Sequence, residues 1–223
     1  MQDQRAELEW RDGAVPVSTR FDDPYFSLDN GLAETRHVFL DGNGLPGRFA
    51  PGFHIAELGF GTGLNLAAAI MAWREAGVDG ALRFTSFEAF PMAASEMERA
   101  LAVFPGAVEA MLPVLAGLAG GAVAVETPDV QFQLVTGDAR ATLPDWQGQA
   151  DAWFLDGFAP ARNPELWEDA LLAEVGRHTR EGGTAATYSA AGAIRRGLAD
   201  AGFEVERVPG YGRKRHMSVA RCL

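Results

Sequence analysis

The chain has 223 residues, of which 48% are hydrophobic and 22% charged, with a formal net charge of -11. This length suits one domain that buries roughly 70% of its unfolded surface, and the single cysteine, Cys222, excludes an intrachain disulfide or thiolate metal cluster. The first twenty residues are polar and no long apolar run follows, so we predict a soluble, cytoplasmic protein without a signal peptide or membrane segment. Because the net charge is negative, such a protein would bind a polyanion only through a local cationic patch.

The first fifty residues are rich in Gly, Asn, Asp and Pro around two short apolar runs at 25–28 and 37–40. These residue types favour turns over regular elements. We therefore expect residues 1–50 to form an irregular N-terminal cap on a core that comprises residues 51–223.

Seven strand-like apolar runs follow the cap, and most are separated by stretches with helical spacing of apolar residues. The predicted strands are 53–58, 82–87, 130–136, 152–155, 184–188, 203–208 and 217–222. The predicted helices are 64–76, 92–104, 164–178 and 190–201. Such alternation builds an α/β fold, in which a mostly parallel sheet is covered by helices on both faces.

Two connections qualify this pattern. The last two predicted strands are separated by residues 209–216 alone, which is too short for a helical crossover, so we expect a C-terminal antiparallel hairpin. Residues 117–124 are a small Ala/Gly stretch, predicted as a surface connection after a helix that Pro113 interrupts. A mostly parallel seven-stranded sheet with this hairpin resembles the Rossmann-like class I methyltransferases more than a symmetric dinucleotide-binding domain.

Three alternating glycines, Gly59, Gly61 and Gly63, follow the first predicted strand and precede a predicted helix. Backbone N–H groups at such a turn and helix start can meet a polar cofactor. The dinucleotide fingerprint is G-x-G-x-x-G, whereas the pattern here is G-x-G-x-G, which favours S-adenosylmethionine. The alternative is a glycine-rich turn without a ligand.

Acidic residues stand at or just after the ends of four predicted strands, where parallel strands bring their carboxyl ends to one edge of the sheet. Glu57 can accept a hydrogen bond from a backbone N–H of the loop or from the cofactor's ammonium. Glu88 can accept both ribose hydroxyl protons, or it is an ordinary acid at a helix N-terminus. Asp138 can accept from the exocyclic amine of adenine or cap the helix that follows, and the two roles are compatible.

Asp156 lies in the sequence Trp-Phe-Leu-Asp-Gly-Phe-Ala-Pro at 153–160. This order is similar to the D-P-P-Y type loop of amino-directed methyltransferases, in which the acid or amide accepts a hydrogen bond from the target nitrogen and the ring stacks on the base. The alternative is a turn aspartate followed by a core phenylalanine, Phe158. The four histidines lack metal-ligand spacing, so we predict no metal site.

Several longer strings resemble the methyltransferase domain of the MnmC family, bacterial enzymes that complete 5-methylaminomethyl-2-thiouridine at the tRNA wobble position. The matching strings are 21–27, 31–36, 57–65, 151–164, 187–192 and 212–217. The resemblance implies methyl transfer to the amine of 5-aminomethyl-(2-thio)uridine, with Asp156 near that amine. It implies S-adenosylmethionine bound by Glu57, Gly59, Gly61, Gly63, Asn65, Glu88, Asp138 and Ala139. Because the family's flavin-dependent oxidase lies beyond these residues, we expect a stand-alone methyltransferase or one whose oxidase is a separate polypeptide.

For a tRNA substrate we expect aromatic side chains on the flipped uracil and cationic ones on phosphates of the anticodon stem-loop. The candidates are Phe158 and Tyr188 for the base, and Arg195, Arg196, Lys214 and Arg215 for the phosphates. The alternatives are core packing and solvated surface, respectively. Two other functions stay open: a non-catalytic adapter that binds cofactor or tRNA, and an NAD(P)-dependent oxidoreductase.

Overall fold

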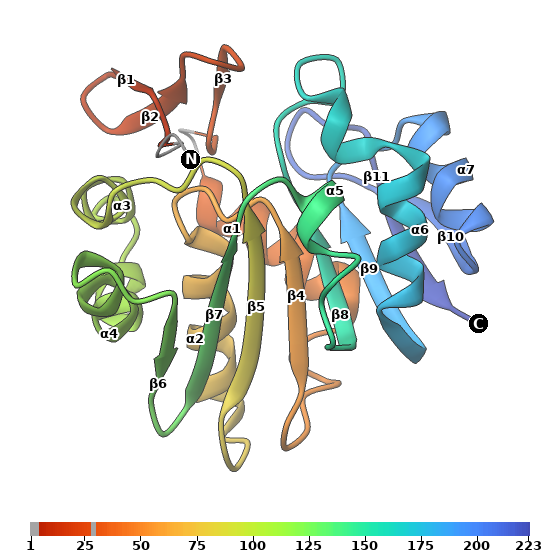
Figure 1. Ribbon diagram of the computed structural model, residues 1–223, viewed down its shortest axis with the longest axis horizontal. Coiled ribbons are helices and arrows are strands. Elements are labelled where there is room, and N and C mark those ends of the chain that lie inside the picture. The colour runs from red at the N-terminus through yellow and green to blue at the C-terminus, as the bar shows by residue number, and fades with distance from the viewer. Residues whose placement is uncertain (1–4, 28–29) are drawn as a thin grey trace.

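The computed structural model describes residues 5–27 and 30–223. An eight-stranded sheet lies at its centre with helices on both faces, and a separate three-stranded antiparallel sheet lies beyond one end of the strands (Figure 1). Residues 1–4 and 28–29 of the predicted cap, including the end of the predicted run 25–28, lie outside the described residues.

The central sheet contains all seven predicted strands. Its members are β4 (His54–Leu58), β5 (Leu82–Glu88), β6 (Ala124–Glu126), β7 (Val130–Thr136), β8 (Ala150–Leu155), β9 (Thr179–Thr187), β10 (Phe203–Pro209) and β11 (His216–Cys222). Their order is β10-β11-β9-β8-β4-β5-β7-β6. β4 is parallel to β5 and β8, β7 to β5, and β9 to β8. The predicted hairpin is confirmed, since β11 pairs antiparallel with β10 and inserts between β10 and β9.

The sheet has one strand more than the seven predicted, because β6 pairs antiparallel with β7 at the edge. β6 begins at the last residue of the predicted surface connection 117–124. Its three residues are exposed, half-buried and exposed, a pattern too short to predict, and pairing with β7 decides the strand. Gly117 permits the approach, since a Cβ there would lie 2.5 Å from Cγ2 of Val125.

The helix α4 (Ala107–Ala119) continues through Pro113, which we had expected to interrupt it. Pro113 is exposed, so the carbonyl that loses its N–H partner lies on the solvent side of the helix. The opposite side buries Met111, Val114 and Leu115 against the core. Burial of this face outweighs the missing hydrogen bond.

Helices cover the two faces of the sheet and create two hydrophobic clusters. One cluster includes residues of α2 (Leu64–Ala76), α3 (Ala94–Leu101) and α4; the other includes residues of α6 (Asp169–Arg177) and α7 (Gly192–Asp200), beside the short α5 (Ala139–Thr142) (Figure 1). The predicted helix 164–178 is divided into a 3-10 turn, Pro164–Trp167, and α6. Within the described ranges, no helix is long and apolar enough to cross a membrane.

The N-terminal region is more regular than the irregular cap we predicted. β1 (Leu8–Arg11), β2 (Val15–Ser18) and β3 (Asp23–Pro24) form the small antiparallel sheet. Asp12 and Gly13 have positive φ values of 51° and 74°, and an Asp-Gly turn is a strong hairpin signal that the prediction overlooked. α1 (Gly31–Thr35) continues into a π-helical segment, Arg36–Leu40, and a 3-10 turn, Asp41–Asn43, and its residues 38–40 are buried in the same cluster as α2.

Candidate functional site

A cavity of about 1430 Å³ lies at the carboxyl ends of the central parallel strands. The chain leaves β4 for β5 on one side, and β8 is the neighbour of β4 on the other. Open α/β sheets bind ligands where the strand order reverses in this way. The walls of the cavity include Gly59, Glu88, Asp138 and Asp156, together with residues of the N-terminal region.

The glycine loop has the predicted strand–turn–helix context, since β4 ends at Leu58 and α2 begins at Leu64. Gly59, Gly61 and Gly63 have φ values of +84°, +53° and +77°, a region that favours glycine. A Cβ on Gly59 would lie 2.9 Å from the carbonyl oxygen of Asp156. Gly59 and Gly61 line the cavity, whereas Gly63, the N-cap of α2, is not part of its wall and provides no side-chain cap.

A buried hydrogen-bond network joins the glycine loop to Asp156. The Nδ2 group of Asn65, the second residue of α2, donates to Oε1 of Glu57 and to Oδ2 of Asp156, both at 2.8 Å. Oδ1 of Asn65 accepts from Oγ1 of Thr35 at 3.0 Å, and Oε2 of Glu57 accepts from Oγ of Ser86 at 2.6 Å. Each of these residues is buried except Asp156, which is half-buried. One amide therefore ties two carboxylates together.

Burial shifts the titration of both carboxylates in this network. It raises the pKa of Glu57 well above the ordinary value, against the hydrogen bonds from Ser86 and Asn65. Burial likewise raises the pKa of Asp156 to about 6, while Asn65, the backbone N–H of Gly157 and the charge of Lys214 oppose the shift. Glu57 is completely buried and lies behind Asn65, so its contact with the cavity passes through that amide.

Glu88 ends β5 and faces the cavity between two loops. Its Oε2 accepts from the backbone N–H of Gly61 at 3.0 Å, and its Oε1 from that of Phe90 at 2.8 Å. A carboxylate oxygen has two lone pairs, so each oxygen retains one acceptor site. α3 begins only at Ala94, so Glu88 lies outside the first turn of that helix. The alternative, that Glu88 is an ordinary acid at a helix N-terminus, is therefore wrong.

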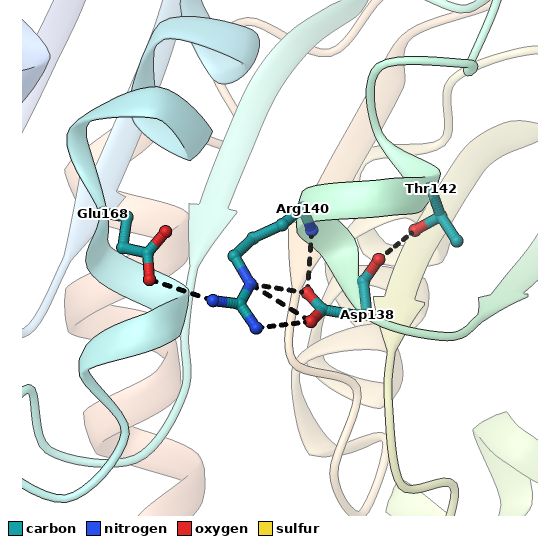
Figure 2. Close-up of polar contacts among 4 residues, drawn as sticks. All are labelled: Asp138, Arg140, Thr142 and Glu168. Carbon is teal, nitrogen blue, oxygen red and sulfur yellow. Dashed lines mark hydrogen bonds and ion pairs between the residues drawn. The ribbon is translucent and has the colours of Figure 1, made fainter.

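Asp138 has a different environment, at the exposed start of α5 (Figure 2). Its Oδ1 accepts from the backbone N–H of Arg140 at 2.9 Å, which confirms the N-cap. The Arg140 guanidinium donates to Oδ2 of Asp138 at 2.7 Å and to Oε1 of Glu168 at 2.9 Å. The hydrogen bond from Arg140 lowers the pKa of Asp138. Asp138 and Ala139 both line the cavity.

The two predicted base-stacking rings also line the cavity. Phe158 stacks on Phe21 with ring centroids 4.7 Å apart and meets the edge of Tyr25 at 5.0 Å. The hydroxyl of Tyr188 donates to the carbonyl of Gly157 at 2.8 Å. Both rings are thus positioned by neighbours, and Phe158 already packs against the N-terminal region.

Of the four residues predicted to contact phosphates, one lines the cavity and three do not. Lys214 lines the cavity, where its Nζ lies 2.9 Å from Oε1 of Glu34 and 4.0 Å from the ring centroid of Tyr188. The cavity walls do not include Arg195, Arg196 or Arg215, and the last two are exposed. The structure therefore brings Lys214 into the cavity that Asp156 lines, half-buries Arg195 outside it, and leaves Arg196 and Arg215 on the surface.

Sequence reasoning missed Thr35, Ser86, Glu34 and Arg140. Ser86 had an indirect signal: it is the register partner of Glu57 in the parallel pair β4–β5, so the correct strand register would have placed the two side by side. Arg140 stands two residues after an N-cap aspartate, a spacing that permits the local ion pair seen here. Thr35 is thirty residues from Asn65, and no local pattern links them.

Comparison with known proteins places this site in context. Residues 104–222 match a protein family described as S-adenosyl-L-methionine-dependent methyltransferase. The tRNA 5-methylaminomethyl-2-thiouridine biosynthesis bifunctional proteins MnmC of Caulobacter vibrioides and Marinobacter nauticus are 48% and 44% identical over 93% and 97% of the chain. The chain spans 36% of each of these relatives. The crystal structure of MNMC2 from Aquifex aeolicus has a TM-score of 0.76 and 26% identity, over 98% of this chain and 71% of that one.

Proposed function

The chain belongs to the S-adenosyl-L-methionine-dependent methyltransferase family, and on this premise we propose that it methylates the amine of 5-aminomethyl-(2-thio)uridine at the tRNA wobble position, giving 5-methylaminomethyl-(2-thio)uridine. The names of the MnmC relatives support this substrate. The observation that carries the proposal is a carboxylate, Asp156, held by two donors in the wall of the cavity that the glycine loop also lines.

The cavity residues fit S-adenosylmethionine. Gly59 and Gly61 line the cavity without side chains of their own, and Glu88 retains acceptor sites suited to ribose hydroxyls. Asp138 and Ala139 line the cavity at the start of α5, where we place the adenine. When bound, the cofactor supplies an electrophilic methyl group on its sulfonium sulfur.

Asp156 would orient the substrate amine and accept its proton. An alkylammonium group is mostly protonated at neutral pH, so a proton must leave before the nitrogen can attack. With a pKa of about 6, Asp156 is ionised at pH 7 and is a stronger base than an ordinary aspartate. Asn65 holds its Oδ2 and the N–H of Gly157 holds its Oδ1, each at 2.8 Å, so positioning supplies much of the catalysis.

The tRNA contacts are part of the same proposal. We place Phe158 and Tyr188 against the flipped uracil, and Arg195, Arg196, Lys214 and Arg215 near phosphates of the anticodon stem-loop. With such contacts, affinity for tRNA falls steeply as salt rises. A flat salt dependence would remove the phosphate role. A tRNA substrate also places the protein in the cytoplasm, with a separate or fused oxidase as the supplier of the amine.

The test is a methyl-transfer assay with radiolabelled S-adenosylmethionine and tRNA from cells that lack this protein, read by nucleoside mass spectrometry. We expect the methylaminomethyl mass to appear, and tRNA with an unmodified wobble uridine to stay unlabelled. Calorimetric titration with S-adenosylhomocysteine checks the cofactor site separately. Binding without transfer would favour the non-catalytic adapter, and no binding would contradict the cofactor assignment.

A further inference from the structure

We infer that Thr35 is a positioning residue that aims Asp156 at the substrate amine by holding the oxygen of the Asn65 side-chain amide in place. The inference rests on the proposed function, because it assigns Asp156 the contact with the amine. Thr35 lies in the N-terminal region, at the end of α1, and acts through Asn65 on the side chain of Asp156.

Both ends of the Asn65 amide have hydrogen-bond partners. An amide has two N–H donors and a carbonyl oxygen that accepts. The two donors go to Glu57 and Asp156, and the acceptor takes the hydroxyl proton of Thr35. The opposite orientation of the amide would turn its oxygen toward two carboxylates and leave Asp156 without this donor. The two carboxylates thus set the orientation of the amide, and Thr35 supplies the donor that the buried amide oxygen needs in that orientation.

The helix that carries Thr35 is itself held in place. Oδ1 of Asn30, the N-cap of α1, accepts from the backbone N–H of Ala33 at 3.3 Å. The following residues Val38, Phe39 and Leu40 are buried in the core. The position of Thr35 is therefore fixed relative to α2, whose second residue is Asn65.

Glu34, the residue before Thr35, also acts on Asp156, through its charge. Glu34 pairs with Lys214, whose charge acts on Asp156. The charged and titratable groups facing Asp156 are thus Glu57 of β4, Glu34 of α1, Lys214 of the β10–β11 hairpin and Tyr188 after β9. A Thr35→Val substitution alters none of these groups and removes one hydroxyl from a side chain of the same shape.

In Thr35→Val, the buried oxygen of Asn65 has no donor, which is unfavourable. We expect the side chain to turn until this oxygen meets water in the cavity, and this rotation withdraws Nδ2 from Asp156. Asp156 then has a less defined position, and its pKa rises because a hydrogen bond to the charged form is lost. As the pH is lowered, the variant therefore loses the activity that needs the ionised carboxylate at a higher pH than the wild type does.

The experiment measures methyl transfer to tRNA by the full chain and its variants across pH. For Thr35→Val we expect kcat to fall by about tenfold to a hundredfold, KM for tRNA to stay unchanged, and the acidic limb of the pH profile to move to higher pH. Thr35→Ser, which keeps the hydroxyl, restores the kcat and the limb. The affinity for S-adenosylhomocysteine stays within twofold.

Thr179→Val is the matched control. Thr179 is 6% exposed, the same fraction as Thr35, and its hydroxyl also donates one hydrogen bond, to the carbonyl of Val175. It starts β9, at the end of the sheet away from the cavity. We expect this variant to keep the wild-type kcat and pH profile. An equal loss in Thr179→Val, or no rescue by Thr35→Ser, would overturn the inference.

A readout without substrate separates this inference from the proposed function. In protein labelled with ¹³C at aspartate carboxyl carbons, the Asp156 signal is identified by its absence in Asp156→Asn. We expect its titration midpoint to rise in Thr35→Val and to return in Thr35→Ser. An unchanged midpoint together with unchanged kcat contradicts the role of Thr35, whereas a wild-type protein that transfers no methyl group contradicts the proposed function. Should Thr35→Val not fold, the same measurements on Thr35→Ala decide.

Discussion

Asp156 and Asp138 follow strands at the same edge of one sheet, yet their surroundings are opposite. Asp156 shares a buried amide with Glu57 and has a raised pKa, whereas Asp138 pairs with an exposed arginine and has a lowered one. The ion pairs of Arg140 are exposed to solvent, and such pairs contribute little to the stability of the fold. The network around Asn65 joins Asp156 to Glu57 and Thr35. We therefore propose that the chemistry depends on Asp156 and that Asp138 serves cofactor binding.

The largest expected effect comes from removing Asp156. Asp156→Ala should lower turnover by about 10²- to 10⁴-fold, since a proton acceptor and its orientation are both lost, while S-adenosylhomocysteine binding stays within about threefold of wild type. Asp138→Ala is the paired variant and should weaken cofactor binding more than turnover. Transfer assays and calorimetry measure both. An unchanged rate for Asp156→Ala would remove it from the catalytic role.

The next effect tests the close contact between the glycine loop and Asp156. Gly59→Ala combines a φ of +84° with a Cβ 2.9 Å from the Asp156 carbonyl oxygen, so we expect a loss of about 2 to 4 kcal/mol in unfolding free energy and a loss of cofactor binding. Gly77→Ala has a φ of +61° and open space around the new Cβ. It should cost about 1 kcal/mol and leave binding intact. Urea denaturation and calorimetry compare the two, and equal losses would show that backbone strain alone matters.

A third effect concerns the pH dependence of stability. The folded-state pKa of Asp156 is raised from 3.8 to about 6, so the folded protein binds more protons than the unfolded chain between these values. Its contribution to stability is thus full below about pH 4 and is lost as pH rises through 6. Asp156→Asn should therefore be more stable than wild type at pH 7, by up to about 3 kcal/mol.

This advantage should disappear near pH 4, where the wild-type carboxyl is protonated as well. Thermal unfolding at the two pH values measures it. A stability difference that is the same at both would show that burial of the charge is not the cause.

The smallest effect is expected on the exposed side. Arg140→Ala removes the ion pairs to Asp138 and Glu168, which are between two-fifths and one-half exposed, so the unfolding free energy should change far less than in Gly59→Ala. The N-cap bond from the backbone of residue 140 remains. Urea denaturation measures the change, and a loss comparable to that of Gly59→Ala would mean that the two sides of the cavity are not energetically distinct.

Much of the fold followed from local patterns. The seven apolar runs and the short link before residue 217 predicted the sheet and its terminal hairpin, because strand and helix periodicities are local properties. The prediction was wrong where tertiary contacts outweighed local signals, as at Pro113 and β6. Glu88, Asp138 and Asp156 were predicted to gather because residues after parallel strands meet at one edge, and all three line the cavity.

The sequence by itself determined which residue types stand at the strand ends and which glycines permit positive φ, since both depend on neighbours along the chain. The tertiary structure alone decided that Thr35 reaches Asn65, that Lys214 lies over Tyr188, and that Asp156 is half-buried in a buried network while Asp138 is exposed. The physical reason is that burial and hydrogen-bond partnership are set by packing between distant segments. A carboxylate's pKa, and with it the chemistry it performs, follows from that packing.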